Sequence, residues 1–556
     1  MTSSNFRGFS EALQRSRHAR RTYPFSVPSE LASKTPTHIP IVIVGAGPVG
    51  LALAKELANH EIPSVVVEKN HASFDASRAV CWSKRTLEIL DRLGVAERML
   101  DKGVTWNIGR VYCAEAEAPL YSFDLLPMKA QKFPAFINLQ QYYTEEYLVD
   151  VLQTQSLVDL RWQHTASGVE SHSDHVALKL ETPSGCYELT CDYLIAADGC
   201  RSAIRDLLGL DFAGRTFEDA FLIADIRMRA PFPAERRFFF NAPFNDGRTA
   251  LIHCQPDDLW RVDFQLGREV DREGVLNPAS VIAKVNAAIG EDIDFEFEWV
   301  SIYTFQCRRM AKFVHDRVIF VGDAAHLVSP FGARGANGGI QDVDNLGWKL
   351  ARVLKGKAPR KLLESYDEER CFGTDENIAN STRATDFMTP KTAAACAFRD
   401  AVLELAPMYP FARRLINSGR LSVPCSLAHS SLVTADNEAF NTPGLGPGTV
   451  ALDAPIVIED QETWWTQQLG TDFVCLHLVD HLHPAPTDSL PPGVRLLRLG
   501  AESPLVDRHG LLAERYDLMP GTSYLFRPDQ HIAGRWRSFD STAIAAAWAK
   551  SLAHPP

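Results

Sequence analysis

The segment Val318–Leu350, VIFVGDAAHLVSPFGARGANGGIQDVDNLGWKL, decides how this chain is interpreted. Its apolar start predicts a short strand that stops at Gly322-Asp323. A loop of small and turn-forming residues follows, and a helix is predicted to begin near Gly335. A carboxylate at a strand end can bind a sugar hydroxyl, and backbone N–H groups at a helix start can hold a negative charge. The segment therefore predicts one end of a ligand site, with a strand–turn–helix packing element as the alternative.

The composition limits the classes of protein to which the chain can belong. With 556 residues, 46% of them hydrophobic and 23% charged, it is typical of a soluble protein with several domains. A net charge of −12 disfavours a nucleic-acid partner, and the absence of a long apolar run disfavours a membrane span. The eleven cysteines include no C-x-x-C pair. We therefore expect reduced thiols, a cytoplasmic location and no metal site.

A glycine-rich stretch, G-A-G-P-V-G at residues 45 to 50, lies between a predicted buried strand and a predicted helix. Gly45 permits a tight turn, Gly47 lets the backbone approach a pyrophosphate, and Gly50 lets the helix pack closely on the strand. Glu68 ends the next predicted strand and can accept hydrogen bonds from ribose hydroxyls. The context predicts a dinucleotide-binding β-α-β unit, and a purely structural β-α-β unit is the alternative.

A third segment, Tyr193–Gly199, is another apolar strand that ends in Asp-Gly. The order of the three motifs resembles that of the FAD-dependent aromatic hydroxylases. These are single-component flavoprotein monooxygenases such as the phenol and 3-(3-hydroxyphenyl)propionate hydroxylases. The resemblance extends from residue 40 to about residue 400. It implies FAD as the cofactor, and the flavin edge, which becomes anionic on reduction, suits the helix start near Gly335.

The resemblance assigns the cofactor-binding residues one by one. Gly45, Gly47, Gly50, Glu68 and Lys69 would serve the ADP part, Arg78 the phosphates and ribityl, and Gln141 the flavin–ribose linkage; Asp198, Gly322 and Asp323 would serve the D-G and G-D motifs, and Gly335, Ala336 and Asn337 the flavin N1–O2 edge. A structural role without cofactor contact is the alternative for three of these residues. Arg78 could be a surface arginine, Gln141 a polar helix start that is confused with Gln140, and Asp198 a strand cap.

Three residues are candidates for catalysis. Pro330 matches a proline whose carbonyl lies beside the reactive flavin face. Arg334 stands where many relatives have a neutral residue, so its guanidinium could stabilise the reduced flavin or attract an anionic substrate; a salt bridge to a carboxylate is the alternative. His253 is the first choice for a substrate-activating group, although a structural role is open for it. Further polar and aromatic candidates are Gln255, Arg261, Asp263, and Phe238 to Phe240.

The predicted fold is α/β, a Rossmann-type FAD-binding domain with an inserted, mostly antiparallel β-sheet substrate domain and a thioredoxin-like C-terminal domain. The predicted parts are a basic arm at 1–39, the FAD-binding domain at 40–216 and 307–400, the substrate domain at 217–306, a helical connector at 401–442 and the thioredoxin-like domain at 443–556. The last resemblance rests on YLFRPDQHIAGRW at residues 524 to 536. Cys475 lacks a C-x-x-C partner there, so a redox role is not expected.

The resemblance implies that NAD(P)H reduces FAD, that O2 adds to give a C4a-hydroperoxide, and that an oxygen atom passes to a phenolic ring held over the flavin. Water must be excluded from the site. The expected partners are a small phenolic substrate and O2, with a homodimer as a possibility. The alternatives are a reductase or another oxidoreductase on the same fold, or a scaffold without catalysis. A halogenase is disfavoured because a W-x-W-x-I-P segment is absent.

Overall fold

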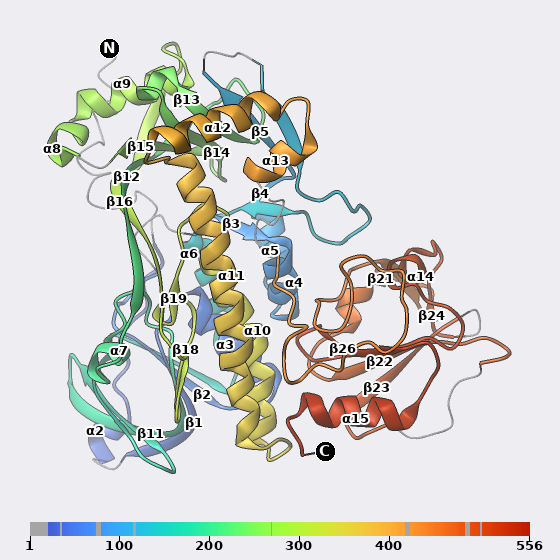
Figure 1. Cartoon of the computed structure of the whole chain (residues 1–556). Helices are drawn as coiled ribbons and strands as arrows, with labels where there is room; N and C mark the ends of the chain where they lie inside the picture. The colour runs from blue at the N-terminus through green and yellow to red at the C-terminus, as the bar shows by residue number, and fades with distance from the viewer. Residues whose placement is uncertain are drawn as a thin grey trace.

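The computed structural model describes residues 20–33, 36–73, 79–114, 118–267, 270–416, 423–483, 490–500 and 503–555. It contains a nucleotide-type α/β domain, a second sheet above it, and a C-terminal α/β domain at its side (Figure 1). The long helix α11 (Glu364–Met388) runs from the first domain up to the second sheet. Arg78 and residues 1–19 of the predicted arm lie outside the described residues.

The nucleotide-type domain is built on five parallel strands in the order β18-β11-β1-β2-β8. Residues 41 to 44 are apolar and buried, as expected for a central strand with both faces covered. The parallel strands are β1 (Thr37–Val44), β2 (Ser64–Glu68), β8 (Val158–Trp162), β11 (Gly185–Ala196) and β18 (Val318–Phe320); β17 (Val314–His315), β10 (Val176–Thr182) and β9 (Thr165–Ser171) extend the sheet in antiparallel pairs. This strand order confirms the predicted Rossmann-type arrangement.

Helix α3 (Pro48–Asn59) packs against α10 (Gly335–Leu354) at very short range. A Cβ atom on Gly339 would lie 2.6 Å from Val49 Cγ2, and one on Gly347 would collide with Glu56. These glycines let α10 lie directly on α3, which fixes where α10 begins. Other helices of this domain are α2 (Glu30–Ser33), α4 (Lys84–Arg92), α5 (Ala96–Lys102), α6 (Gln141–Gln153) and α7 (Ala203–Leu207).

The second sheet has eight strands in the order β19-β16-β12-β15-β14-β13-β5-β6, antiparallel apart from the β13–β5 pair. Alternation sends Ala224, Ile252 and Val262 to one face, where α8 (Arg272–Val275) and α9 (Pro278–Ile289) lie. The strands are β5 (Ile108–Cys113), β6 (Tyr121–Asp124), β12 (Ala213–Met228), β13 (Arg236–Ala242), β14 (Arg248–Cys254), β15 (Leu259–Gly267), β16 (Phe295–Arg309) and β19 (His326–Leu327). The sheet thus extends past the predicted 217–306 range and recruits two strands from residues 108 to 124.

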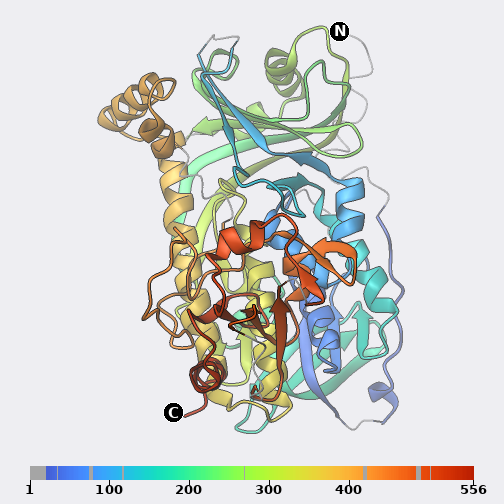
Figure 2. The same cartoon turned by 90° about the vertical axis from the view of Figure 1, so that its right-hand side faces the viewer.

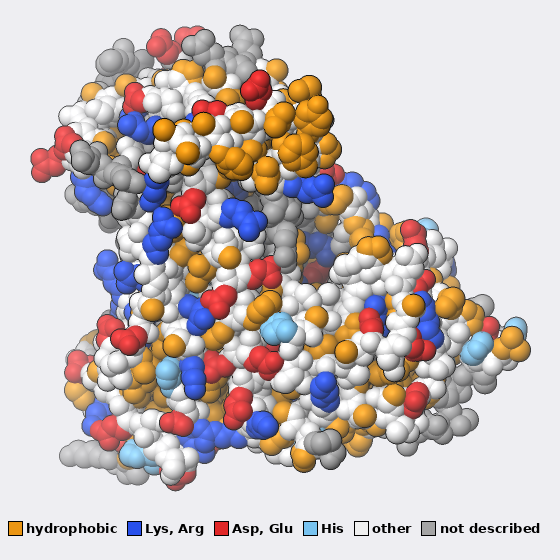
Figure 3. Space-filling view, in the orientation of Figure 1, with side chains coloured by type: hydrophobic (Ala, Val, Ile, Leu, Met, Phe, Trp, Pro, Cys, Tyr) orange, Lys and Arg blue, Asp and Glu red, His pale blue; other side chains and the backbone are white. Residues whose placement is uncertain are grey.

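A small sheet of β3 (Cys81–Ser83), β7 (Phe136–Asn138) and β4 (Val104–Trp106) lies between the two larger sheets. Beyond α11 the chain forms α12 (Ala393–Leu405) and α13 (Pro410–Ile416). The predicted helical connector at 401–442 is helical only in its first part, since residues 423 to 442 form neither helix nor strand. Exposed Phe398, Met408 and Phe411 give the outer face of α12 and α13 an apolar patch (Figure 3).

The C-terminal domain is a mixed sheet in the order β21-β20-β24-β23-β22-β25-β26. It lies against α10 and α4 of the first domain (Figure 2), and Trp348 of α10 packs into a cluster with Phe473 and Trp536. Its elements are β20 (Pro455–Ile458), β21 (Gln461–Trp464), β22 (Phe473–Leu478), β23 (Val494–Leu499), β24 (Leu505–Val506), β25 (Ser523–Phe526), β26 (Ile532–Trp536), α14 (Leu511–Tyr516) and α15 (Ser541–Ser551). Whether it is thioredoxin-like stays a prediction. Across the described residues, no helix has both the length and the apolar character needed to cross a membrane.

Candidate active site

The glycine turn at residues 45 to 50 is closed on one side and open on the other. Gly45 has φ +110°, and a Cβ there would overlap the Ala197 carbonyl; a Cβ on Gly50 would overlap the Gly45 carbonyl. Gly47, in contrast, has no neighbouring atom within 4 Å of an added Cβ. The open side at Gly47 is where the backbone N–H groups at the start of α3 can receive a pyrophosphate.

Glu68 is held at the edge of this turn. One carboxylate oxygen accepts the Ala46 amide hydrogen at 2.9 Å, and the other accepts two hydrogen bonds from Asn70, at 2.9 Å and 2.6 Å. The carboxylate is therefore fixed beside the pyrophosphate position, as a ribose-binding acid requires. Lys69 follows it as an exposed side chain.

Asp198 stands at the end of β11, next to the glycine turn. Its Oδ2 accepts the Ile204 amide hydrogen at 3.1 Å, while its buried Oδ1 has no hydrogen-bond partner. Burial raises the pKa of this carboxyl group. A buried oxygen without a partner is uncommon in a folded protein, and a ligand hydroxyl or a water molecule at this position would satisfy it.

The G-D turn after β18 is fixed by a carboxylate that the sequence analysis did not single out. Asp342 is fully buried and accepts hydrogen bonds from the Gly322 amide at 2.9 Å and from His326 Nε2 at 2.7 Å. It also binds Arg370 Nε at 2.6 Å. Burial acts to raise the pKa of Asp342, but the charges of His326 and Arg370 hold that pKa below its usual range. The turn therefore presents Asp323, half-buried, at a defined place.

The first turn of α10 contains Gly335, Ala336 and Asn337, whose amide hydrogens have no acceptor within the helix. The Asn337 side chain accepts from the Ser83 amide at 3.0 Å and donates to the Cys81 carbonyl at 2.9 Å and to the Ala333 carbonyl at 2.6 Å. Its side chain thus ties the helix start to β3, while its backbone amide points along the helix axis. The sequence predicted only a role for the backbone of Asn337, and not the role of its side chain.

The side chains of Gln141 and Gln140 point in different directions. Gln141 begins α6, accepts the Ala79 amide hydrogen at 3.3 Å and donates to Glu145 at 2.8 Å. Gln140 is buried and donates to the Pro256 carbonyl at 3.3 Å. Gln141 therefore faces the segment that follows the predicted Arg78 position, and Gln140 faces the second sheet.

The loop between β19 and α10 carries two of the catalytic candidates. The Pro330 carbonyl accepts the Ala333 amide hydrogen at 3.0 Å, and Gly332 and Ala333 have positive φ values of 110° and 52°. Arg334 precedes α10, is buried and donates to the Asn377 side chain at 2.9 Å. One partner of Arg334 is thus an amide on α11, a contact that sequence alone could not identify.

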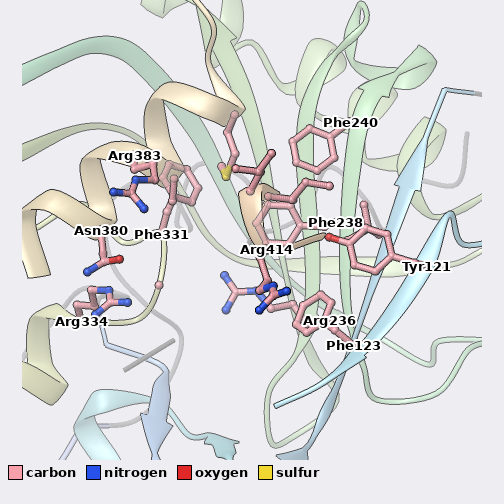
Figure 4. Close-up of a pocket in the computed structure, with 16 residues that line it drawn as sticks. Tyr121, Phe123, Arg236, Phe238, Phe240, Phe331, Arg334, Asn380, Arg383 and Arg414 are labelled. Carbon is pink, nitrogen blue, oxygen red and sulfur yellow. The ribbon is translucent and has the colours of Figure 1, made fainter. Parts of the chain in front are cut away.

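A pocket lies where this loop meets the second sheet (Figure 4). Its walls come from β5, β6, β13, the 331–334 loop, α11 and α13. They combine aromatic rings with arginines and contain no Asp or Glu. The aromatic and charged or amide-bearing lining residues are Tyr121, Phe123, Phe238, Phe240, Phe331, Arg236, Arg334, Asn380, Arg383 and Arg414. Two of the three aromatic candidates from the sequence, Phe238 and Phe240, line the pocket, whereas Phe239 packs against Phe244 on the other face of the sheet. Arg236, Arg383 and Arg414 were not singled out.

His253 lies on the same sheet face as Arg236 and Arg261, its neighbours on the adjoining strands. It is buried, and its Nδ1 lies 4.0 Å from Cys81 Sγ, the residue whose carbonyl binds Asn337. Burial and the two arginines lower the pKa of His253 well below its usual value. The histidine is therefore neutral near pH 7, and Cys81 is close both to it and to the Asn337 side chain at the α10 start.

Arg261 and Asp263, two of the candidates from the sequence, do not form an ion pair with each other. Arg261 instead binds both carboxylate oxygens of Asp225, at 2.8 Å and 3.0 Å. Asp263 Oδ1 is buried without a hydrogen-bond partner, and burial raises the pKa of its carboxyl group to about 6. A buried carboxyl group whose pKa is raised toward neutrality is a feature of functional sites, and Asp263 is not among the residues that line the pocket.

Comparison with known proteins identifies the family. Residues 38–380 match the model of the family described as FAD binding domain. This chain belongs to that family. The flavoprotein is 30% identical over 516 residues, 88% of its length and 94% of the relative's, to 12-dehydrotetracycline 5-monooxygenase/anhydrotetracycline 6-monooxygenase of Streptomyces rimosus. It is 26% identical over 549 residues, 91% and 96% of the two lengths, to 3-(3-hydroxy-phenyl)propionate/3-hydroxycinnamic acid hydroxylase of Burkholderia cenocepacia.

Solved structures confirm the fold of the flavoprotein. The flavin-dependent monooxygenase PieE, in complex with FAD and substrate, superposes with a TM-score of 0.77 at 21% identity, covering 94% of this chain and 100% of that one. The resemblance stated from the motifs is thus confirmed, and so is its consequence that the chain is an FAD-dependent aromatic monooxygenase. The geometry fits the cofactor, because the open turn at Gly47 and the unpartnered oxygen of Asp198 lie at adjacent strand ends.

Proposed function

We propose that this flavoprotein uses NAD(P)H and O2 to hydroxylate a phenolic ring held in the pocket of Figure 4. One observation carries the proposal: Gly332 and Arg334, which line the aromatic pocket, directly precede the α10 start at Gly335. A ring in the pocket would therefore lie beside the place where the helix amides receive the flavin edge. Bound FAD would supply the oxygen-transfer chemistry, and the chain's own residues would hold both partners.

The residues at the strand ends would divide the cofactor between them. The glycine turn with Glu68 would hold the ADP part, and Lys69 would lie outside it. Asp198 and Asp323 would bind hydroxyl groups, and Gln141 the region between ribose and flavin. The amides of Gly335, Ala336 and Asn337 would stabilise negative charge on the flavin edge, with the Arg334 guanidinium adding to it. Arg78 keeps its proposed phosphate role.

His253 and Asp263 would activate the phenol. Their side chains are 3.9 Å apart, measured from Nε2 to Oδ2, and both contain a buried polar atom without a partner. A phenol hydroxyl placed between them can donate its proton toward Asp263, which is ionised above pH 6. His253 would hold the hydroxyl as a neutral hydrogen-bond partner. Pro330 would border the ring at the flavin side.

The experiment is a screen of a phenol panel with the FAD-loaded protein. NADH and NADPH consumption, oxygen uptake and product mass are followed together. A product heavier than its phenol by one oxygen atom supports the proposal. NAD(P)H oxidation that yields only hydrogen peroxide with every phenol, or electron transfer to an organic acceptor without oxygen uptake, would favour a reductase instead. A protein that does not take up FAD would favour a scaffold.

We also propose a cytoplasmic location and a role for the C-terminal domain. All eleven cysteines are free thiols in the structure, which suits a reducing cytoplasm. Cys475 is buried on β22, and burial raises the pKa of its thiol to about 12. We therefore propose that the C-terminal domain is thioredoxin-like in shape only and serves stability or homodimer formation.

A further inference from the structure

We propose that Arg236 binds an oxyanion carried by the aromatic substrate, so that the pocket selects ionised phenols or aromatic acids over neutral aromatic compounds. The proposal rests on the proposed function, since it names the substrate class of the same pocket. Arg236 is the first residue of β13 and lines the pocket with its guanidinium. It was not singled out from the sequence, because a sequence does not reveal which buried charges lack a counterion.

The partners of Arg236 leave its charge unmatched. Its side chain is 7% exposed, and its Nε is buried with no hydrogen-bond partner. Nη1 has only the weak acceptor Cys81 Sγ, at 3.8 Å. The guanidinium lies 5.6 Å from the ring centre of Trp106 and 5.5 Å from that of Phe238. Within the part of the chain that the structure describes, no carboxylate lies within ion-pair distance of it, and Asp263 attracts its charge only from farther away.

Several other buried arginines of this protein have a carboxylate partner, and Arg205 donates instead to the carbonyls of Ala324 and Cys200, at 3.1 Å and 2.9 Å. Arg261 binds Asp225 through two hydrogen bonds, and Arg370 binds Asp342 at 2.6 Å. Arg527 binds Glu369 with both terminal nitrogens. A buried charge without a counterion is costly, and such a charge is kept where a ligand supplies the missing partner. Arg236 therefore differs from these arginines in its hydrogen-bond and ion-pair partners, and not in how deeply it is buried.

The chemistry of the pocket points to an oxyanion on an aromatic ring. Aromatic faces hold a guanidinium by cation–π attraction but do not neutralise it, and the planar donor fork matches a carboxylate or a phenolate. Three more arginines, Arg334, Arg383 and Arg414, line the same pocket, and no acidic residue does. Figure 4 shows these side chains around one hollow with the rings of Tyr121, Phe123 and Phe238.

Arg237 provides a matched control on the same strand. Its side chain points to the opposite face, pairs with Glu235 at 2.9 Å and stacks on the ring of Phe232. It does not line the pocket. The two neighbouring arginines thus differ in one respect that matters here, which is whether the protein itself provides a counterion.

The test titrates FAD-loaded protein with 3-(3-hydroxyphenyl)propionate and with its neutral amide, and follows the flavin absorbance, so that binding is measured without turnover. We expect the acid to bind at least tenfold more tightly than the amide if the carboxylate is the bound oxyanion. If the ring oxygen is the bound oxyanion, the amide should bind with a phenolate absorbance band at neutral pH. Arg236→Met should abolish either signal and Arg237→Met should keep it, with FAD content checked for both.

A second measurement covers the case in which neither probe binds. An unpaired buried guanidinium destabilises the ligand-free fold, so Arg236→Met should raise the melting temperature while Arg237→Met should not. Equal affinities for acid and amide without a phenolate band, or a lower melting temperature for Arg236→Met, would overturn the proposal. Failure of the proposed function is distinct from both, because it would appear as missing FAD or missing hydroxylated product.

Discussion

His253 Nε2 lies 3.9 Å from Asp263 Oδ2, too far for a direct hydrogen bond and close enough for one hydroxyl group to bridge them. His253 Nε2 and Asp263 Oδ1 are both buried without a partner. Two unsatisfied groups on neighbouring strands are costly unless a ligand or a water molecule completes them. We therefore propose that a phenol hydroxyl binds between these two side chains.

Replacement of Asp263 by Asn should impair hydroxylation, because the amide cannot accept the phenol proton. Loss of a positioned base typically lowers the rate about 10²- to 10⁴-fold. The measurement is kcat/KM for product formation against pH. In the unaltered protein it should rise as pH passes about 6, where Asp263 ionises. The variant should lack that rise, and an unchanged profile would remove Asp263 from the reaction.

The same replacement should affect stability in the opposite direction. Burial raises the pKa of Asp263 from 3.8 to about 6, so the folded protein holds the proton on this carboxyl group more tightly than the unfolded chain does. The protonated group therefore stabilises the fold below pH 3.8, and this contribution is lost as pH rises from 3.8 through 6. The neutral amide of the Asp263→Asn variant avoids that loss. Its free energy of unfolding should match that of the unaltered protein near pH 3.8 and exceed it by roughly 3 kcal/mol at most above pH 6. Denaturant titrations at the two pH values test this.

Gly45 and Gly47 should respond differently to added side chains. Gly47 has an extended backbone and open space around it, so Gly47→Val should fold normally and obstruct the approach of the pyrophosphate. We expect at least tenfold weaker FAD binding with an unchanged melting temperature of the FAD-free protein. Gly45→Ala should instead lower that melting temperature, because its Cβ overlaps the Ala197 carbonyl. Unchanged FAD affinity of Gly47→Val would contradict the assignment.

The parts of the site that could be predicted from sequence are those that local chain geometry defines. The turn at residues 45 to 50, the acid Glu68 and the α10 start at Gly335 all lie where strand and helix signals meet. Each depends on residues close in sequence, for which spacing is informative. Helix α10 begins at Gly335, and the sequence predicted a start near this residue.

The parts that could not be predicted depend on residues far apart in the chain. Asp342 accepts a hydrogen bond from the amide of Gly322, which lies 20 residues earlier in the chain. Arg334 donates a hydrogen bond to Asn377, which lies 43 residues later. Strands β5 and β6 join the second sheet through a parallel pair that no alternation pattern reveals. Arg236 is distinguished because, among the described residues, no carboxylate lies within ion-pair distance of its guanidinium. Such features depend on the packed environment, which a one-dimensional pattern does not contain.

Asp342→Asn should weaken both the fold and FAD binding. The carboxylate fixes the Gly322 amide and neutralises Arg370, so the amide leaves a buried cation unpaired. Breaking a buried pair costs about 3–5 kcal/mol. Asp375→Asn is the control, because its pair with Arg309 is partly exposed and should be worth about 0–1 kcal/mol. Chemical denaturation and FAD titration of both variants provide the comparison, and equal effects would refute the role of Asp342.

The C-terminal domain is joined to the flavoprotein core by a buried ion network, and Arg527→Met should show that the two parts fold together. Arg527 is fully buried and binds Glu369 of α11 at 2.6 Å and 3.0 Å, and Glu369 also binds Lys349 of α10 at 2.6 Å. Without Arg527, Glu369 keeps its charge with one partner fewer, at a cost of about 3–5 kcal/mol.

Because α10 carries both Lys349 and the proposed flavin-binding start at Gly335, the loss should appear as one cooperative unfolding transition at lower denaturant and as earlier release of FAD. Arg537→Met, which removes a partly exposed partner of Asp517 in the same domain, is the matched control and should shift the transition little. Two separate transitions for Arg527→Met, with FAD release confined to the second, would mean that the C-terminal domain does not support α10, the helix proposed to bind the flavin.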